Sequence, residues 1–260
     1  TSVDGLRGMF ILVMASGHFV VLGPLIEPLS YRSLSFSDPA QGFVFISGLV
    51  LGMVVTGKMH VKGFAEAKSY VFGRTALIYK YHVAILLFAI FATWNIHDLP
   101  PALSNAASSS PVVNILLGLT LIHQPNYLNI LPMYLLLVLP TAFIMRAFDR
   151  GYSAAILATS ALLWLSSGVS PISAAYEVFQ IAAEKLHIQG KYDHHFNVFG
   201  WQIIYVVGLY IGWRVKTKKF DFTFFKSGQG NYIALCALAA TLVMYLYRNY
   251  TAVPVELIHR

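Results

Sequence analysis

Two side chains in the first apolar run, Gly5 to Ile26, carry the strongest chemical signal in this sequence: Arg7 and His18. Their spacing of eleven residues, at about 100° per residue, puts both on one helical stripe with Asp4 and Met14. A neutral imidazole suits a general base, and Arg7 supplies a permanent charge for phosphate or carboxylate recognition. Because charged groups in an apolar run are costly without a partner or cavity, we predict a functional face; the alternative is a core histidine and a helix anchor.

The second motif, F-S-D-P-A-Q-G-F-V-F-I-S-G from Phe36 to Gly48, places a polar pair before a proline. Ser37 or Asp38 could cap a helix that begins at Pro39, and this structural role is favoured over catalysis. Further along, G-x-x-x-G spacings occur at Gly48/Gly52 and Gly208/Gly212, which permits close helix packing.

A third group of polar side chains lies along one helical face. Arg74, Tyr81 and His82 lie near one stripe, and Tyr79 lies beside it. Arg74 and Lys80 could bind an anionic cofactor, or they could be ordinary anchors at a membrane boundary.

Two later apolar segments begin with polar groups. Asn129 is a candidate cap in L-N-I-L-P-M-Y, from Leu128 to Tyr134. Asn197 and Trp201 share a face and, with the neighbouring Gln202, offer hydrogen bonds and an aromatic platform to a sugar ring. An interfacial aromatic belt is the alternative interpretation.

The composition indicates the elements that must position these groups. Of 260 residues, 57% are hydrophobic and 11% charged, against about 25% charged in ordinary soluble domains. We therefore expect an all-α protein, a polytopic transmembrane helical bundle in membrane lipid. The net charge of +7 comes from groups between apolar runs, without a nucleic-acid motif, so no nucleic-acid partner is expected. One cysteine and an adjacent histidine pair give no metal-ligand spacing, and no metal site is expected.

The chain has about eight apolar segments and no linker that would divide residues 1–260 into more than one domain. They are Gly5 to Ile26, Pro39 to Thr56, Arg74 to Asn95, Val112 to Ile122, Asn129 to Phe148, Ser153 to Ser167, Asn197 to Trp213 and Tyr232 to Tyr247. Segment 112–122 is short or re-entrant. If it does not span, all basic clusters fall on one side, so we favour seven spans, one partial segment and an inside N-terminus.

Taken together, these motifs resemble the OpgC family, the membrane succinyltransferases that modify osmoregulated periplasmic glucans. The resemblance runs from Asp4 to about Gly212 and rests on D-G-L-R-G with His18, the Phe36 to Gly48 motif, Arg74 to Tyr79, L-N-I-L-P-M-Y and F-N-V-F-G-W-Q. The family is similar to the wider acyltransferase-3 group, whose signature arginine and histidine are matched by Arg7 and His18. Family members have more membrane helices, so the chain is expected to be truncated at its C-terminus.

The resemblance implies acyl transfer at a bacterial inner membrane, crossed several times by the chain. The donor is a cytoplasmic acyl-CoA, with succinyl-CoA expected, and the acceptor is a hydroxyl of a periplasmic glucan; no tightly bound cofactor is expected. His18 is the expected general base, and Arg7 orients the donor. The donor-binding residues are Arg74 and Tyr79, and the acceptor-binding residues are Asp38, Asn197, Trp201 and Gln202. Helices around the site are supported by Asp4, Ser37, Asn129 and Tyr134.

Two other functions remain compatible with a polar membrane face. A transporter or flippase for an acyl donor or glycan also uses buried arginine and histidine, and internal inverted repeats would favour it. A noncatalytic sensor or scaffold predicts that protein groups supply every partner of Arg7 and His18.

Overall fold

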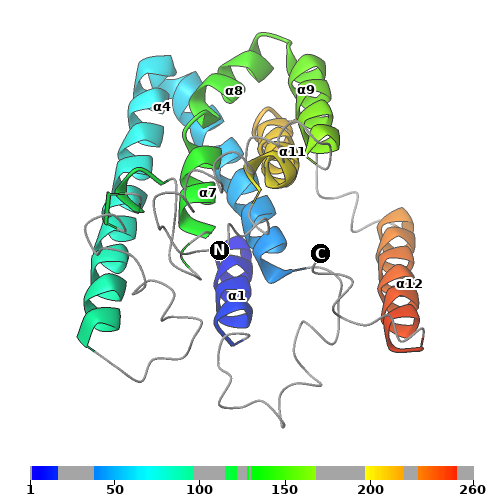
Figure 1. The fold of residues 1–260 in the computed structure, drawn as a ribbon. Helices are drawn as coiled ribbons and strands as arrows, with labels where there is room; N and C mark the ends of the chain where they lie inside the picture. The colour runs from blue at the N-terminus through cyan, green and yellow to red at the C-terminus, as the bar shows by residue number, and fades with distance from the viewer. Residues whose placement is uncertain are drawn as a thin grey trace.

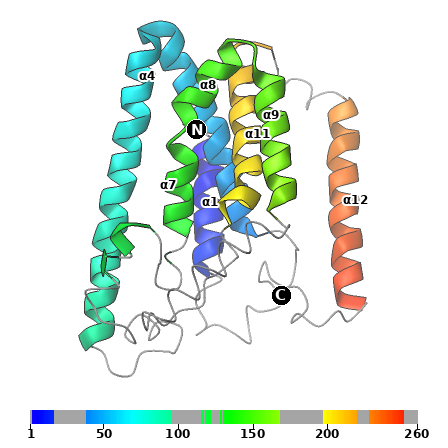
Figure 2. The ribbon, with the colours of Figure 1, turned by 45° about the horizontal axis from the view of Figure 1, so that its top comes forward.

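The structure is a computed structural model that describes residues 2–16, 38–95, 115–116, 118–121, 128, 130–167, 197–219 and 228–250. Within these ranges the regular elements are helices, which confirms the all-α prediction. The helices are α1 (Ser2–Ser16), α4 (Pro39–Asn95), α7 (Ile130–Val138), α8 (Thr141–Asp149), α9 (Ser153–Ser166), α11 (Val198–Lys216) and α12 (Gly228–Tyr250). They lie roughly parallel or antiparallel to one another, as Figure 2 shows.

The longest helix, α4, bends back on itself at Gly63. This glycine has φ 85° and ψ 172°, a conformation that a side chain would strain. Figure 1 shows the chain reversing direction there, so α4 has a first arm, residues 39–62, and a second arm, residues 64–95. The sequence predicted a polar connection between two apolar segments. Both arms instead continue through it, because its Lys, Glu and Ala residues favour a helix.

Three helices of the described ranges are long and apolar enough to cross a membrane, fewer than the eight segments predicted. They are Pro39–Ala92, Ile130–Asp149 and Val198–Lys216. Part of the difference comes from α4, which merges two predicted segments, and Ser153–Ser166 is a shorter apolar helix. Residues 17–26 of the first predicted segment lie outside the described residues. Of segment 112–122, residues 115–116 and 118–119 are helical and a turn follows at 120–121.

The first arm of α4 packs closely against α11, and small residues make this approach possible. Gly48 and Gly52 lie against α11, while Gly208 and Gly212 lie against the first arm of α4. A Cβ atom built on Gly52 would lie 2.5 Å from the carbonyl oxygen of Leu209, and a Cβ on the other three would meet backbone just as closely. The predicted close packing at both glycine pairs is therefore confirmed.

Three basic groups of the sequence lie at one end of the bundle. Asp149, at the end of α8, contacts His60 near the α4 bend and Trp213 in the last turns of α11. The basic residues at this end, called the basic end below, are Lys58, Lys62, Lys68, Arg146, Arg150, Arg214, Lys216, Lys218 and Lys219. This common location agrees with the arrangement expected if segment 112–122 does not cross the membrane.

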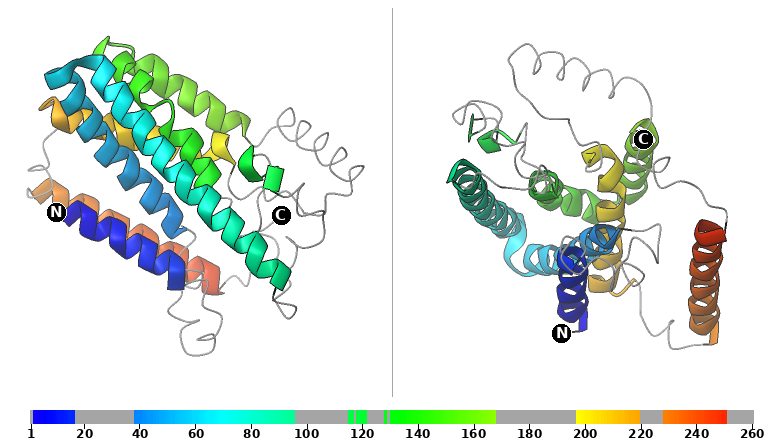
Figure 3. Two further views of the ribbon diagram at one scale, coloured as in Figure 1. Left: turned by 90° about the vertical axis from the view of Figure 1, so that its left-hand side faces the viewer. Right: turned by 60° about the horizontal axis from the view of Figure 1, so that its bottom comes forward.

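Buried side chains of α7 and α8 fill the space between the arms of α4 and α11. Met133, Val138, Met145 and Phe148 are at most 2% exposed, and they pack in one cluster with Leu209 of α11. Figure 3 shows these helices grouped around the first arm of α4, with α1 beside it. This packing holds α1, α4 and α7 around a common interior, where the candidate site lies.

Candidate anion-binding site

Arg7 lies where α1 crosses the beginning of the first arm of α4. The ring of Phe10, one turn further along α1, occupies the space beside Gly42 where a side chain would otherwise stand. This contact brings the Arg7 guanidinium carbon to 5.9 Å from the centre of the Phe43 ring. The Nε atom of Arg7 is buried and makes no hydrogen bond. Arg7 is thus held by packing, with a donor still available.

Arg74 reaches the same interior from the second arm of α4. Its guanidinium faces the hydroxyl groups of Tyr134 on α7 and Tyr70, one turn earlier on the same arm. Its Nε atom is buried and makes no hydrogen bond. Tyr205 of α11 lies near Arg74 and Tyr134, but its hydroxyl is 2.7 Å from Thr141 Oγ1 and therefore already has a partner.

Tyr134 connects the two arginines. Its ring lies 5.7 Å from the ring of Phe43, and the Arg7 guanidinium contacts that same phenylalanine ring. The Tyr134 hydroxyl lies on the side of Arg74. Tyr134 is 6% exposed, and its hydroxyl makes no hydrogen bond. We call Arg7, Phe43, Tyr70, Arg74 and Tyr134 the arginine–tyrosine cluster.

The cluster has the chemistry of an anion site. Both guanidinium groups carry a permanent charge and have a buried N–H without an acceptor, and the Tyr134 hydroxyl can donate as well. Among the carboxylates whose side chains the structure describes, which leave out Asp4, none forms an ion pair with Arg7 or Arg74. An unsatisfied buried donor costs about 1 to 3 kcal/mol, and a carboxylate or phosphate oxygen can accept from donors of this kind.

The cluster extends from Tyr70, which lies beside Lys58 of the basic end, towards the beginning of the first arm of α4. Phe43 precedes Lys58 by fifteen residues, which places it about 22 Å from that lysine along the first arm. Arg74 follows Lys68 by six residues, or about 9 Å along the second arm. Phe43, and with it Arg7, therefore lies further from the basic end than Arg74 does.

Tyr79 and His82 hold a short segment against the second arm of α4. The Tyr79 hydroxyl donates to the carbonyl oxygen of Leu119 at 2.9 Å, and His82 Nε2 lies 3.3 Å from the carbonyl oxygen of Gly118. Leu86, one turn beyond His82, fills the space beside Gly118. The structure thus gives Tyr79 a partner outside the cluster. Its predicted contact with a donor stays a prediction.

His82 is a candidate that the sequence interpretation did not assign to the site. It is fully buried, and its Nδ1 atom makes no hydrogen bond. The signal was present, because Arg74 and His82 are eight residues apart and therefore share a helical face. What the sequence could not indicate was the burial of this face beneath Gly118.

Two of the predicted acceptor-binding residues begin helices. Asp38 Oδ1 accepts a hydrogen bond from Ala40 N at 2.8 Å and caps α4, with Pro39 in the first turn, as predicted. Asn197 Oδ1 accepts from Phe199 N at 2.9 Å and caps α11. Each side chain has a structural partner, and contact with an acceptor remains a prediction for both.

The other two predicted acceptor-binding residues lie within α11 and face its neighbours. Trp201 is 8% exposed and belongs to the buried core. The Gln202 amide makes two bonds to Ser160 of α9: its Nε2 donates to the Ser160 carbonyl at 2.7 Å, and its Oε1 accepts from the Ser160 hydroxyl at 2.6 Å. Gln202 therefore links α11 to α9 in this structure.

Some predicted site residues lie outside the described residues. These are His18, Ser37, Asn129 and the side chain of Asp4. The structure therefore brings together Arg7, Arg74 and Tyr134 from the predicted set. In the part of the chain that it describes, no group of three or more His, Cys, Asp or Glu residues is arranged to hold a metal ion.

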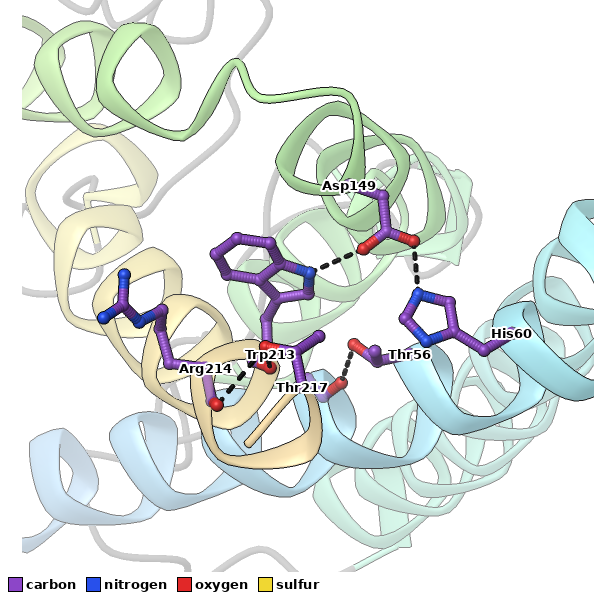
Figure 4. Close-up of polar contacts among 7 residues, drawn as sticks. Thr56, His60, Asp149, Trp213, Arg214 and Thr217 are labelled. Carbon is purple, nitrogen blue, oxygen red and sulfur yellow. Dashed lines mark hydrogen bonds and ion pairs between the residues drawn. The ribbon is translucent and has the colours of Figure 1, made fainter. Parts of the chain in front are cut away.

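A second polar junction lies at the basic end and is shown in Figure 4. Trp213 Nε1 donates to Asp149 Oδ1 at 2.6 Å, and His60 Nε2 lies 2.7 Å from Asp149 Oδ2. One carboxylate thus joins α4, α8 and α11. Because both of its oxygens have partners from the protein, this junction has a structural role.

Comparison with protein families gives one match over nearly the whole chain: the family model described as OpgC protein matches residues 1–258. The chain belongs to the OpgC family. Comparison with curated proteins and with solved structures gave no match. Membership of the OpgC family supports a glucan-modifying acyltransferase in general, and the apolar helices agree with a membrane protein.

Proposed function

We propose that this OpgC-family chain is a membrane O-acyltransferase that moves a succinyl or similar acyl group from cytoplasmic acyl-CoA to hydroxyls of a periplasmic glucan. The observation that supports this most strongly is the arginine–tyrosine cluster. It offers two guanidinium groups and a phenol to an anion inside an apolar bundle. A succinyl donor carries anions of the required kind, a carboxylate at the acyl end and phosphates at the CoA end.

The basic end would face the cytoplasm of the cell, since basic residues concentrate on that side of inner-membrane proteins. The donor would approach from this end, and Arg74, about 9 Å beyond Lys68, would be the first half-buried cation on its path. Arg7 would bind the anionic end further inside. The two arginines would orient the thioester carbonyl towards the acceptor.

His18 would act as the general base. Its neutral imidazole would take the proton from a glucan hydroxyl while the hydroxyl oxygen forms a bond to the thioester carbonyl carbon. The carbon–sulfur bond then breaks, and the CoA thiolate takes up the proton from the imidazolium. The products are a glucan ester and free CoA.

The function is tested by transfer of labelled succinate from succinyl-CoA to a glucan by the purified chain in lipid nanodiscs. We expect transfer by the wild type and a loss of about 10²-fold or more in His18→Ala, the usual contribution of a general base. Arg150→Gln removes an exposed cation outside the cluster and serves as the control. Unchanged transfer by His18→Ala would exclude it as the base, and donor uptake into vesicles without ester formation would support a transporter.

A further inference from the structure

A pocket of about 400 Å³ lies at the basic end, between the first arm of α4 and the last turn of α11. Three lysines line it, Lys58 and Lys62 from α4 and Lys216 from α11. The rest of its wall is formed by Met53, Val54, Gly57 and Val61. The pocket is open on one side and therefore reachable by an outside molecule.

Contacts with the protein define where two of the lysine chains lie. The Lys216 side chain lies across Gly57, where a Cβ atom would be only 2.9 Å from Lys216 Cε, so the missing side chain makes room for it. Lys58 Nζ lies 4.6 Å from the centre of the Tyr70 ring. Among the described residues, no carboxylate forms an ion pair with the three lysines, and the nearby Asp149 is occupied by His60 and Trp213.

This combination suits an amphiphilic anion. Three ammonium groups attract a phosphate, and the methionine and valines beside them offer an apolar surface that a freely soluble phosphate would not use. Basic pockets between membrane helices are recognised by anionic lipid headgroups, and a lipid at this boundary extends its chains along the apolar helix faces.

We infer that the pocket formed by Lys58, Lys62 and Lys216 binds the phosphate headgroup of an anionic phospholipid. The headgroup lies among the three lysines, and the start of an acyl chain lies against Met53, Val54 and Val61. Tyr70 contacts Lys58 and also faces Arg74, so the lipid pocket adjoins the arginine–tyrosine cluster without overlapping it.

Native mass spectrometry of the purified full chain, titrated with phosphatidylglycerol or phosphatidylcholine, tests this inference. The test variant is Lys58→Gln/Lys62→Gln/Lys216→Gln. The control, Lys68→Gln/Arg150→Gln/Lys218→Gln, removes the same charge from exposed positions at the same end. We expect phosphatidylglycerol affinity to fall by about tenfold or more in the test variant and by less than about threefold in the control.

Size-exclusion profiles and circular dichroism check that both variants are folded, and single substitutions at Lys62 and Lys216 replace the test variant if it does not fold. Equal loss of binding in test and control, or equal binding of phosphatidylcholine and phosphatidylglycerol by the wild type, would overturn the inference. Displacement of the lipid by micromolar free CoA would also overturn it, because the pocket would then serve a soluble phosphate.

Discussion

Replacing Gly52 with alanine should push α4 and α11 apart. The new Cβ atom would lie 2.5 Å from the Leu209 carbonyl oxygen, and the Leu209 carbonyl carbon and Cα atom would both be 3.1 Å away. Ordinary contacts of a Cβ atom begin at 3.4 Å, so the closest one is short by 0.9 Å (3.4 minus 2.5). The obstructing atoms belong to a helix backbone. A side-chain rotation therefore cannot relieve the overlap.

A shift of this size also loosens the contacts that Gly48, Gly208 and Gly212 make across the same interface. Overpacking costs about 1 to 3 kcal/mol, and alanine returns up to about 1 kcal/mol through its better helix propensity. Gly73→Ala is the matched control, because Gly73 is also helical and exposed but has nothing within 4 Å of its Cβ position. Gly73→Ala should be neutral or stabilising.

Thermal unfolding in detergent, followed by circular dichroism or tryptophan fluorescence, distinguishes these variants. At about 2 to 4 °C per kcal/mol, Gly52→Ala should melt several degrees below the wild type. Gly73→Ala should melt at the wild-type temperature or slightly above it. The close packing of α4 on α11 would be refuted if Gly52→Ala melted together with Gly73→Ala.

Three further predictions follow from polar side chains between the helices. Tyr205→Phe should lower the free energy of unfolding by about 1 to 2 kcal/mol because it removes the hydrogen bond to Thr141. Tyr134→Phe should leave the melting temperature unchanged and weaken donor binding. Equal melting temperatures of the two variants would contradict this. Asp149→Leu should lower the melting temperature and shift tryptophan fluorescence. Asp149→Asn should have a smaller effect, because its amide oxygen still accepts the hydrogen bond from Trp213. The same melting temperature and fluorescence in both variants would refute a role for the Asp149 oxygen as acceptor. Gln202→Leu should lower the free energy of unfolding by about 1 to 2 kcal/mol, because it removes the two hydrogen bonds to Ser160, while the KM for glucan stays constant. A raised KM without destabilisation would instead indicate that Gln202 binds the acceptor.

Local features of the structure followed from the sequence. The cap at Asp38 and the proline after it depend on residues next to each other in the chain, and the structure confirms both. The packing role of Gly48 and Gly52 also follows from spacing along one helix. Such features depend on residues that are close in the sequence, so a sequence pattern can predict them.

Features that depend on tertiary packing could not be predicted. The sequence placed Arg7 and Arg74 on separate helices, and only the fold shows that Phe43 and Tyr134 bring them together. The bend at Gly63 lies in a stretch whose Lys and Glu residues resemble an ordinary connection, although they continue both helices. The bonds of Gln202 to Ser160 could not be predicted either, because Ser160 is distant in the chain.

The central claim is that the arginine–tyrosine cluster binds the anionic part of the acyl donor. Isothermal titration of the purified chain with succinyl-CoA, compared with Arg74→Gln, Arg7→Gln and the control Arg150→Gln, tests it most directly. A charge-assisted hydrogen bond contributes about 1.5 to 3 kcal/mol, so each cluster variant should weaken binding by about 10- to 100-fold while the control binds like the wild type. Wild-type affinity in both cluster variants, with folding intact, would contradict the account.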